Sequence, residues 1–188
     1  MGNYDPAWAR VRFHGGYQEL VVTFAKLNHL EESLIEELDV AFTEGMVDVE
    51  ENEAHMGEME WVTDILEHLK IPYDRSWDKG FDFVAGEERA RQHKHESGKI
   101  MMGHEEFEDQ EFMMLSTVAL RELFKEADGQ FDVAVDKFEE MAREKEFKSP
   151  SLEDLVPDED ELERVRQVIY AFRIAGTDPV ISKSYQER

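Results

Sequence analysis

The chain has 188 residues, and its 45 Asp and Glu against 21 Lys and Arg give a formal net charge of −24. Apolar residues make up 41% of it, so a packed core is expected and global disorder is not. The charge argues against direct binding of nucleic acid, phosphates or anionic membranes and favours basic partners. The absence of cysteine excludes disulfides and thiolate chemistry and fits a reducing compartment.

No stretch of the chain has the pattern of a secretory signal or a membrane span. The N-terminus lacks a basic segment followed by an apolar one. No apolar run approaches the ~18 residues that would mark a membrane-spanning helix. We therefore expect a cytoplasmic protein without a membrane partner.

The N-terminal segment admits two interpretations. Residues 11–13 and 20–24 are β-branched and aromatic, and residues 14–16, His-Gly-Gly, are typical of a turn, which favours a hairpin. The apolar positions of residues 17–27 also fit a helical period of 3.6. We prefer the hairpin, because Asn28 with Glu31 three residues later is typical of a helix that starts only there.

Two amphipathic helices follow, separated by a short strand. The first is predicted over about 29–44 with Gly45 as its stop, and residues 46–49 alternate like a strand. The second helix is predicted over 56–70 and ends before Pro72.

Further strands complete the first half of the chain. Residues 73–77 and 81–84 have strand character on either side of a turn. The element order over 1–104 predicts an α+β domain, with an antiparallel or mixed sheet and two helices on one face. Residues 87–99 form a basic island, interpreted as an exposed loop, and residues 100–102 are expected to return as a strand.

The C-terminal part, residues 105–188, is predicted to be helical and to pack on the first domain. Its last helix has the clearest signals, with Asp158 as N-cap, Glu161 three positions later and Gly176 as stop. The other expected elements are helices over 112–123 and 131–145, a linker at 148–151 and a loose tail over 177–188.

No motif for catalysis or for a cofactor is found. The chain has no Gly-x-Ser-x-Gly, no phosphate-binding loop, no dinucleotide fingerprint and no His-Glu-x-x-His. The spacing of His93 and His95 suits a strand face that binds Zn²⁺, yet it is common and lies among basic residues. The segment from Asp48 to Glu60 lacks the glycine of a calcium-binding loop. We expect neither an enzyme nor a bound metal.

The carboxylates are concentrated in windows without any Lys or Arg. These windows are residues 27–69, 100–120 and 149–163. The first coincides with the predicted amphipathic helices, so its acidity belongs to a folded surface. Halophilic acidity usually accompanies depletion of large apolar residues, whereas 11% of this chain is aromatic.

An acidic helix face can imitate the outline of a polynucleotide. Duplex DNA carries one charge per ~1.7 Å of axis. Glutamates at i and i+4 of a helix recur about every 6 Å, and here they come as adjacent pairs. Such a face can occupy a groove that is built for phosphates. The predicted contact residues are Glu31, Glu32, Glu36, Glu37, Glu50, Glu51, Glu53, Glu58 and Glu60.

One segment resembles known sequences. Residues 53–66, EAHMGEMEWVTDIL, and 71–78, IPYDRSWD, are similar to a stretch of small acidic phage and plasmid proteins. In charge the chain also resembles anti-restriction and anti-CRISPR proteins, several of which mimic DNA. The resemblance implies an inhibitor of a restriction enzyme or a CRISPR effector complex, but it carries over no contact residue.

A second hypothesis is a structural or assembly protein of a phage or plasmid. It would form oligomers, for example a homodimer, through its helical half. The Met pairs at 101–102 and 113–114 could contribute an adaptable surface, although such pairs more often fill a core.

Overall fold

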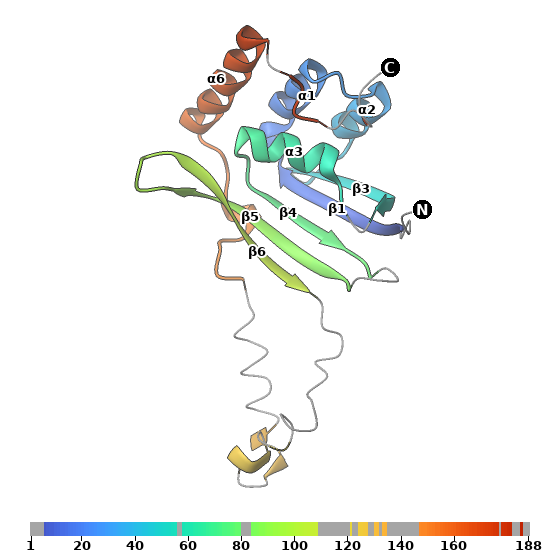
Figure 1. The fold of residues 1–188 in the computed structure, drawn as a ribbon, viewed down its shortest axis with the longest axis vertical. Coiled ribbons are helices and arrows are strands. Elements are labelled where there is room, and N and C mark those ends of the chain that lie inside the picture. Colours follow the sequence, from blue (N-terminus) through green and yellow to red (C-terminus); the bar gives the residue numbers. More distant parts are fainter. Residues whose placement is uncertain are drawn as a thin grey trace. The chain divides into compact units, whose positions relative to one another are not determined.

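An antiparallel sheet forms the centre of the fold (Figure 1). Its strands follow the order β2–β3–β1–β4–β5–β6. In this computed structural model the strands are β1 Pro6–His14, β2 Phe42–Thr43, β3 Met46–His55, β4 Tyr73–Trp77, β5 Gly86–Lys94 and β6 Ile100–Glu108. The structure describes residues 6–55, 58–79, 84–108, 121, 124–127, 130–131, 133–134, 147–176, 178–181 and 185.

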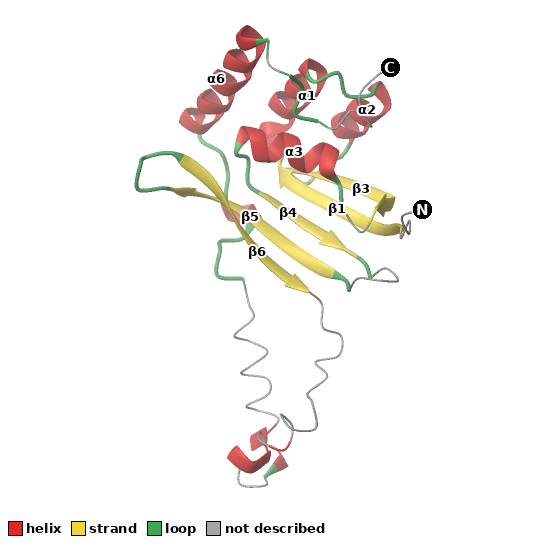
Figure 2. Ribbon diagram, viewed as in Figure 1, coloured by secondary structure: helices red, strands yellow, loops and turns green. Residues whose placement is uncertain are grey.

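Helices cover one face of this sheet (Figure 2). They are α1 Gln18–Leu27, α2 Glu32–Val40, α3 Glu60–Leu69 and α6 Glu159–Ala175, with short 3-10 turns η1 Gly15–Tyr17 and η2 Leu152–Asp154. Alternate residues of β1, such as Val11 and Phe13, are fully buried against them, together with Phe24 and Trp61. The alternation leaves Arg10 and Arg12 on the opposite face, which we call the open face.

The chain divides into two compact units. One comprises Met1–Glu108 and Ser149–Arg188, and the other comprises Asp109–Lys148. In the second unit, Ala127 and Ala134 are buried with Phe124 packed against them. The predicted division of the chain at residue 104 stays a prediction.

The N-terminal hairpin prediction is wrong. Residues 18–27 are helix α1, because Val21, Val22, Phe24 and Ala25 bury one helical face in the core. β1 finds its antiparallel partners far along the chain, in β3 and β4.

Asn28 caps the end of a helix instead of starting one. Its side-chain amide donates to the Phe24 carbonyl at 2.8 Å, and its Oδ1 accepts the Val180 N–H at 2.8 Å. The helix predicted over 29–44 is therefore shorter at both ends. Its last residues form β2 and a tight turn in which Glu44 and Gly45 have φ of 51° and 86°, as a two-residue hairpin requires.

Several other elements agree with the sequence. β4 lies where it was predicted, and α3 ends at Leu69 before Lys70 in the left-handed region. α6 begins after Asp158, whose carboxylate accepts the Glu161 N–H at 2.8 Å, and it ends at Gly176.

Three strands differ from their predictions. β3 and β6 extend well beyond 46–49 and 100–102, and the helix predicted over 56–70 begins only at Glu60. The basic island at 87–99 is largely β5, so its interpretation as a loop is wrong. Most of 81–84 and of the helices at 112–123 and 131–145 lies outside the described residues.

Candidate functional site: an acidic surface on α2, β3 and α3

Helix α2 displays carboxylates on its solvent side. Leu38 is fully buried and Leu34 and Ile35 are half-buried, so the helical period turns Glu32 and Glu36 outward. Asp39 at the end of α2 and Glu31, the residue just before α2, are also exposed. Within the described part of the chain, no ion pair takes its carboxylate from α2.

Helix α3 repeats the arrangement beside it. Trp61, Val62, Ile65, Leu66 and Leu69 anchor its buried face. The remaining face carries Glu60, which is exposed, and Asp64 one turn later, which is half-buried. The fully buried anchors fix the direction in which these carboxylates point.

Strand β3 contributes a carboxylate between the two helices. Its register with β1 shifts between Ala7 and Ala9, and Glu51 lies opposite Ala9, which is buried under the helices. The Trp61 indole N–H donates to Glu51 Oε2 at 3.3 Å. Glu51 therefore lies on the helix-covered face, as Val47 and Val49 do earlier in the strand, and points towards α3.

The carboxylates of these three elements are close enough to perturb one another. Burial, followed by the charge of Glu51, raises the pKa of Glu37. Burial, followed by the charges of Glu60 and Glu67, raises the pKa of Asp64. Each shift means that the folded protein holds a negative charge in an unfavourable place.

Tyr185 lies among the same groups. Its pKa is raised first by burial and then by Glu51, Glu60, Asp64 and Glu58. Its carbonyl oxygen accepts the Glu31 N–H at 3.1 Å, which ties this residue to the start of α2. We call Glu37, Glu51, Glu58, Glu60 and Asp64 the acidic cluster.

The structure brings together part of the predicted contact set. Four of its members belong to the acidic cluster: Glu37, Glu51, Glu58 and Glu60. Glu31, Glu32 and Glu36 are exposed at and along α2, and Glu53 is exposed on β3. Glu50 lies elsewhere, on the open face, with its Oε1 3.8 Å from Arg10 Nε.

Sequence reasoning missed two residues of this surface. Asp64 could have been found, because it follows Glu60 by four residues on the same helix face. Tyr185 lies in the segment predicted as a loose tail, and no pattern in the sequence links it to residues 37–64.

The arginines of the sheet are engaged on the open face. Arg10 Nη2 and Arg12 Nε lie 2.7 Å and 2.9 Å from Asp48 Oδ1, and Arg91 Nη2 lies 2.6 Å from Asp74 Oδ1. Arg91 is buried. The sheet thus pairs its arginines with its own acids, and no Lys or Arg that the structure describes forms an ion pair with the acidic cluster.

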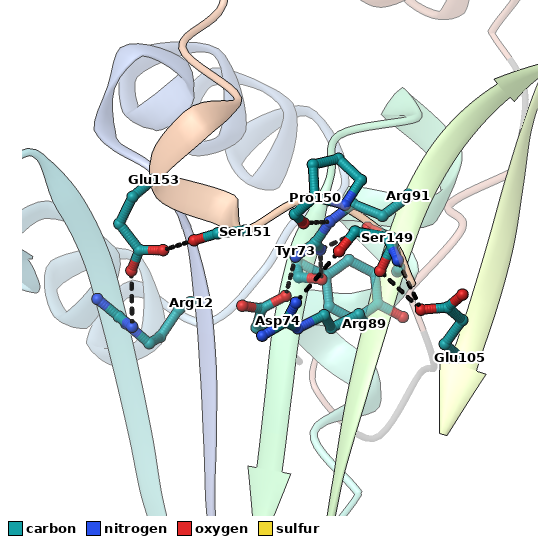
Figure 3. Close-up of polar contacts among 11 residues, drawn as sticks. Arg12, Tyr73, Asp74, Arg89, Arg91, Glu105, Ser149, Pro150, Ser151 and Glu153 are labelled. Carbon is teal, nitrogen blue, oxygen red and sulfur yellow. Dashed lines mark hydrogen bonds and ion pairs between the residues drawn. The ribbon is translucent and has the colours of Figure 1, made fainter. Parts of the chain in front are cut away.

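A segment that we call the strap, residues 149–154, crosses this face (Figure 3). Arg91 Nε donates to the Pro150 carbonyl at 2.9 Å and its Nη1 to the Tyr73 carbonyl at 2.8 Å. Ser149 Oγ donates to Glu105 at 2.8 Å, and Arg12 Nη1 reaches Glu153 at 3.3 Å. These contacts hold the chain that leads into α6.

The histidines contact neighbouring polar groups. His104 lies between two carboxylates, with Nδ1 2.6 Å from Glu88 and Nε2 3.3 Å from Glu67. His95 Nδ1 is 3.0 Å from Ser97 Oγ. Among the described residues no group of His, Asp and Glu has the arrangement of a metal site.

No family model, curated protein or solved structure matches the chain. Function must therefore be argued from the acidic surface itself. Within the described ranges, no helix combines the length and the apolarity that crossing a bilayer requires.

Proposed function

We propose that this protein is an inhibitor that occupies the nucleic-acid-binding surface of a cytoplasmic partner protein. The acidic cluster and the exposed carboxylates of α2 would occupy the positions at which the partner binds phosphates. The favoured partners are a host restriction enzyme or a CRISPR effector complex, as the resemblance to anti-defence proteins implies. The proposed role involves no catalysis and no cofactor.

The observation that supports the proposal is the self-repulsion built into the surface. The pKa of Glu37 and that of Asp64 are raised first by burial and then by neighbouring carboxylates, Glu51 for Glu37 and Glu60 and Glu67 for Asp64. Acidity that served solubility alone would gain nothing from this crowding, because spreading the same charges lowers their mutual repulsion. A groove lined with Lys and Arg would relieve the repulsion on binding.

The scaffold under the surface is suited to a rigid match. Leu38, Trp61, Ile65 and Leu66 are at most 1% exposed, so α2 and α3 are anchored through close-packed side chains. Charges fixed in this way lose little conformational freedom when they bind, which favours affinity.

A competition experiment tests the mimicry. With the partner purified from host lysate by pull-down, added duplex DNA should displace this protein, because both would occupy the same basic groove. Binding that persists at saturating DNA would show that the groove is not the target.

A charge-reversal set tests the surface. Replacing Glu31, Glu32, Glu36 and Glu37 by Lys should slow association with the partner by about tenfold or more, and more strongly at low salt. A matched set, in which four other exposed acids become Lys, namely Asp154 of η2 and Glu159, Asp160 and Glu163 of α6, should change the rate far less. Equal effects of the two sets would mean that only net charge matters.

The second candidate is a structural protein that oligomerises through its helical C-terminal half. Tyr170 and Ile174, one turn apart on α6, are 66% and 65% exposed, which leaves an apolar strip on this helix. The prediction of a helical C-terminal part over 105–188 belongs to this candidate, although residues 105–108 are the end of β6. A mass that rises with concentration in light scattering, and that Tyr170→Ser with Ile174→Ser abolishes, would favour it over inhibition.

A further inference from the structure

The open face carries an alternating row of charges across the sheet. The strand register places Asp48, Arg12, Asp74, Arg89 and Glu105 side by side on β3, β1, β4, β5 and β6. Acid and base therefore alternate from strand to strand, and each charge has an opposite charge as its neighbour. Figure 3 shows four of these side chains beneath the strap.

The next row breaks this alternation at its centre. Its members, on the same strands, are Glu50, Arg10, Ser76, Glu87 and Phe107. An acid at the β4 position would continue the pattern, but Ser76 is short and uncharged. Arg10 and Glu87 thus face each other across a small residue, with their backbones about 10 Å apart, two strand spacings.

A cavity of about 250 Å³ lies at this position. Ser76 lines it with Arg10 and Arg12 from β1, Glu87 and Arg89 from β5, and Glu153 from the strap. A short side chain flanked by long ones explains the hollow. The cavity is slightly smaller than the usual range for ligand sites, about 300–1,000 Å³, which suits a compact polar molecule.

The charges of the lining are balanced. On the open face, Arg10, Arg12 and Arg89 stand against Asp74, Glu87 and Glu153. Arg75 and Glu88 also line the cavity, but their side chains lie on the other face of the sheet and pair with each other. The carboxylates of the lining would repel a polyanion, and its arginines would repel a simple cation. A ligand that carries one charge of each sign suits both.

Among the residues that line the cavity, Glu87 contributes least to holding the fold together. It is exposed, and it makes no ion pair with any other described residue. The strap is held instead by Arg12, Arg89 and Arg91, whose contacts with residues 149–153 lie in the alternating row and beyond it. Arg10 already binds Asp48 Oδ1 through Nε and Nη2, which leaves its Nη1 for a ligand. Within the described part of the chain neither Arg10 nor Glu87 contacts the strap, so a ligand on them would not loosen it.

We propose that the hollow over Ser76 binds a small zwitterion. Its carboxylate would lie against Arg10, its ammonium group against Glu87, and its carbon chain over Ser76. This site is on the opposite face from the acidic cluster and does not depend on the function proposed for that surface.

Amino acids of increasing length serve as a ruler for the site. Glycine, 4-aminobutyrate and 6-aminohexanoate are titrated into the full-length protein, with amide chemical shifts as the readout. Butyrate and butylamine, which each carry one of the two charges, are the reference ligands. One of the amino acids should bind at least about tenfold more tightly than either reference, because only it satisfies both ends.

Two variants locate the binding. Glu87→Gln should weaken the zwitterion towards the affinity of butyrate and leave butyrate itself unaffected, whereas Glu106→Gln, on the other face of the sheet, should change neither. Ser76→Leu fills the hollow and should abolish binding of all the ligands. The proposal is overturned if butyrate or butylamine binds as tightly as the best amino acid. It is also overturned if no amino acid binds saturably, or if the Glu87→Gln protein binds the zwitterion as tightly as before.

Discussion

Single carboxylates on the acidic surface are held at a cost in stability. Glu37 and Asp64 have pKa values raised above 4.5 and 3.8, the ordinary values of these side chains. In the pH range just above those values, the folded chain keeps protons that the unfolded chain has released. The free energy of unfolding therefore falls as the pH rises through this range, and by neutral pH the stability that the protons supplied is lost.

Neutral replacements should recover this stability. Asp64→Asn removes a like-charge contact with Glu60 four residues earlier on α3, a type of contact that costs about 0.2–0.5 kcal/mol. We expect Asp64→Asn and Glu37→Gln each to raise the melting temperature at pH 7 by roughly 1–2 °C. Their gain should shrink as the pH is lowered towards 4, where the natural side chains are protonated.

The control for these variants is Glu96→Gln, at the tip of the β5–β6 hairpin. It makes the same change of charge on an exposed residue far along the chain from the acidic cluster. Thermal unfolding followed by circular dichroism at several pH values measures all three. If the control matched the two variants, the gain would come from net charge and not from the local crowding.

At the scale of elements, one buried side chain joins the sheet to the strap. Arg91 is 7% exposed and contacts Asp74, the Tyr73 carbonyl and the Pro150 carbonyl. Arg91→Met leaves Asp74 without its ion pair and removes the hydrogen bond from β5 to the Pro150 carbonyl of the strap. Breaking a buried pair of this kind costs about 3 kcal/mol or more in the free energy of unfolding.

Urea unfolding measures that loss. Arg166→Met on α6 is the matched control, because Arg166 pairs with Glu159 and Glu163 in solvent. The control should leave the unfolding midpoint unchanged, since exposed pairs contribute little. A small effect of Arg91→Met would mean that the strap is held by Leu152, which is fully buried, and not by its polar contacts.

The sequence predicts elements whose signals are local. The capping residues of α6 and the turn after α3 lie within a few positions of the ends they define, and both were placed correctly. The same is true of β4, whose turn residues flank it. The strand–helix choice for residues 17–27 depended instead on partners far along the chain, because β1 pairs with β3 and β4.

The candidate site shows the same limit. The helical period identifies the carboxylates of α2 and α3, but the faces on which Glu50 and Glu51 lie follow from β3 continuing beyond residue 49, where the predicted strand ends. A shift of one residue in a strand moves a side chain to the other face of the sheet. The basic island was misread for a related reason, since Arg89 and Arg91 find their acids through strand register and not through sequence neighbours.

For the whole molecule, charge and stability oppose each other. The net charge is −24, and the arginine ion pairs of the described sheet lie largely on the face away from the acidic cluster. Added salt shortens the screening length from about 30 Å at 0.01 M to about 10 Å at 0.1 M. We therefore expect the melting temperature to rise with NaCl, mostly below about 0.1 M, because repulsion on the acidic surface weakens while the partly buried pairs change little.

Association with a basic partner should respond to salt in the opposite direction. The attraction between the acidic surface and a phosphate-binding groove is screened by the same ions that stabilise the free protein, so the association rate should fall over the range in which the melting temperature rises. Stopped-flow binding and thermal unfolding in matched buffers measure the two trends. In the variant with Glu31, Glu32, Glu36 and Glu37 changed to Gln, both trends should flatten together, since one set of carboxylates produces them. Flattening of the stability trend alone would separate the acidity of this surface from recognition and would favour the structural candidate.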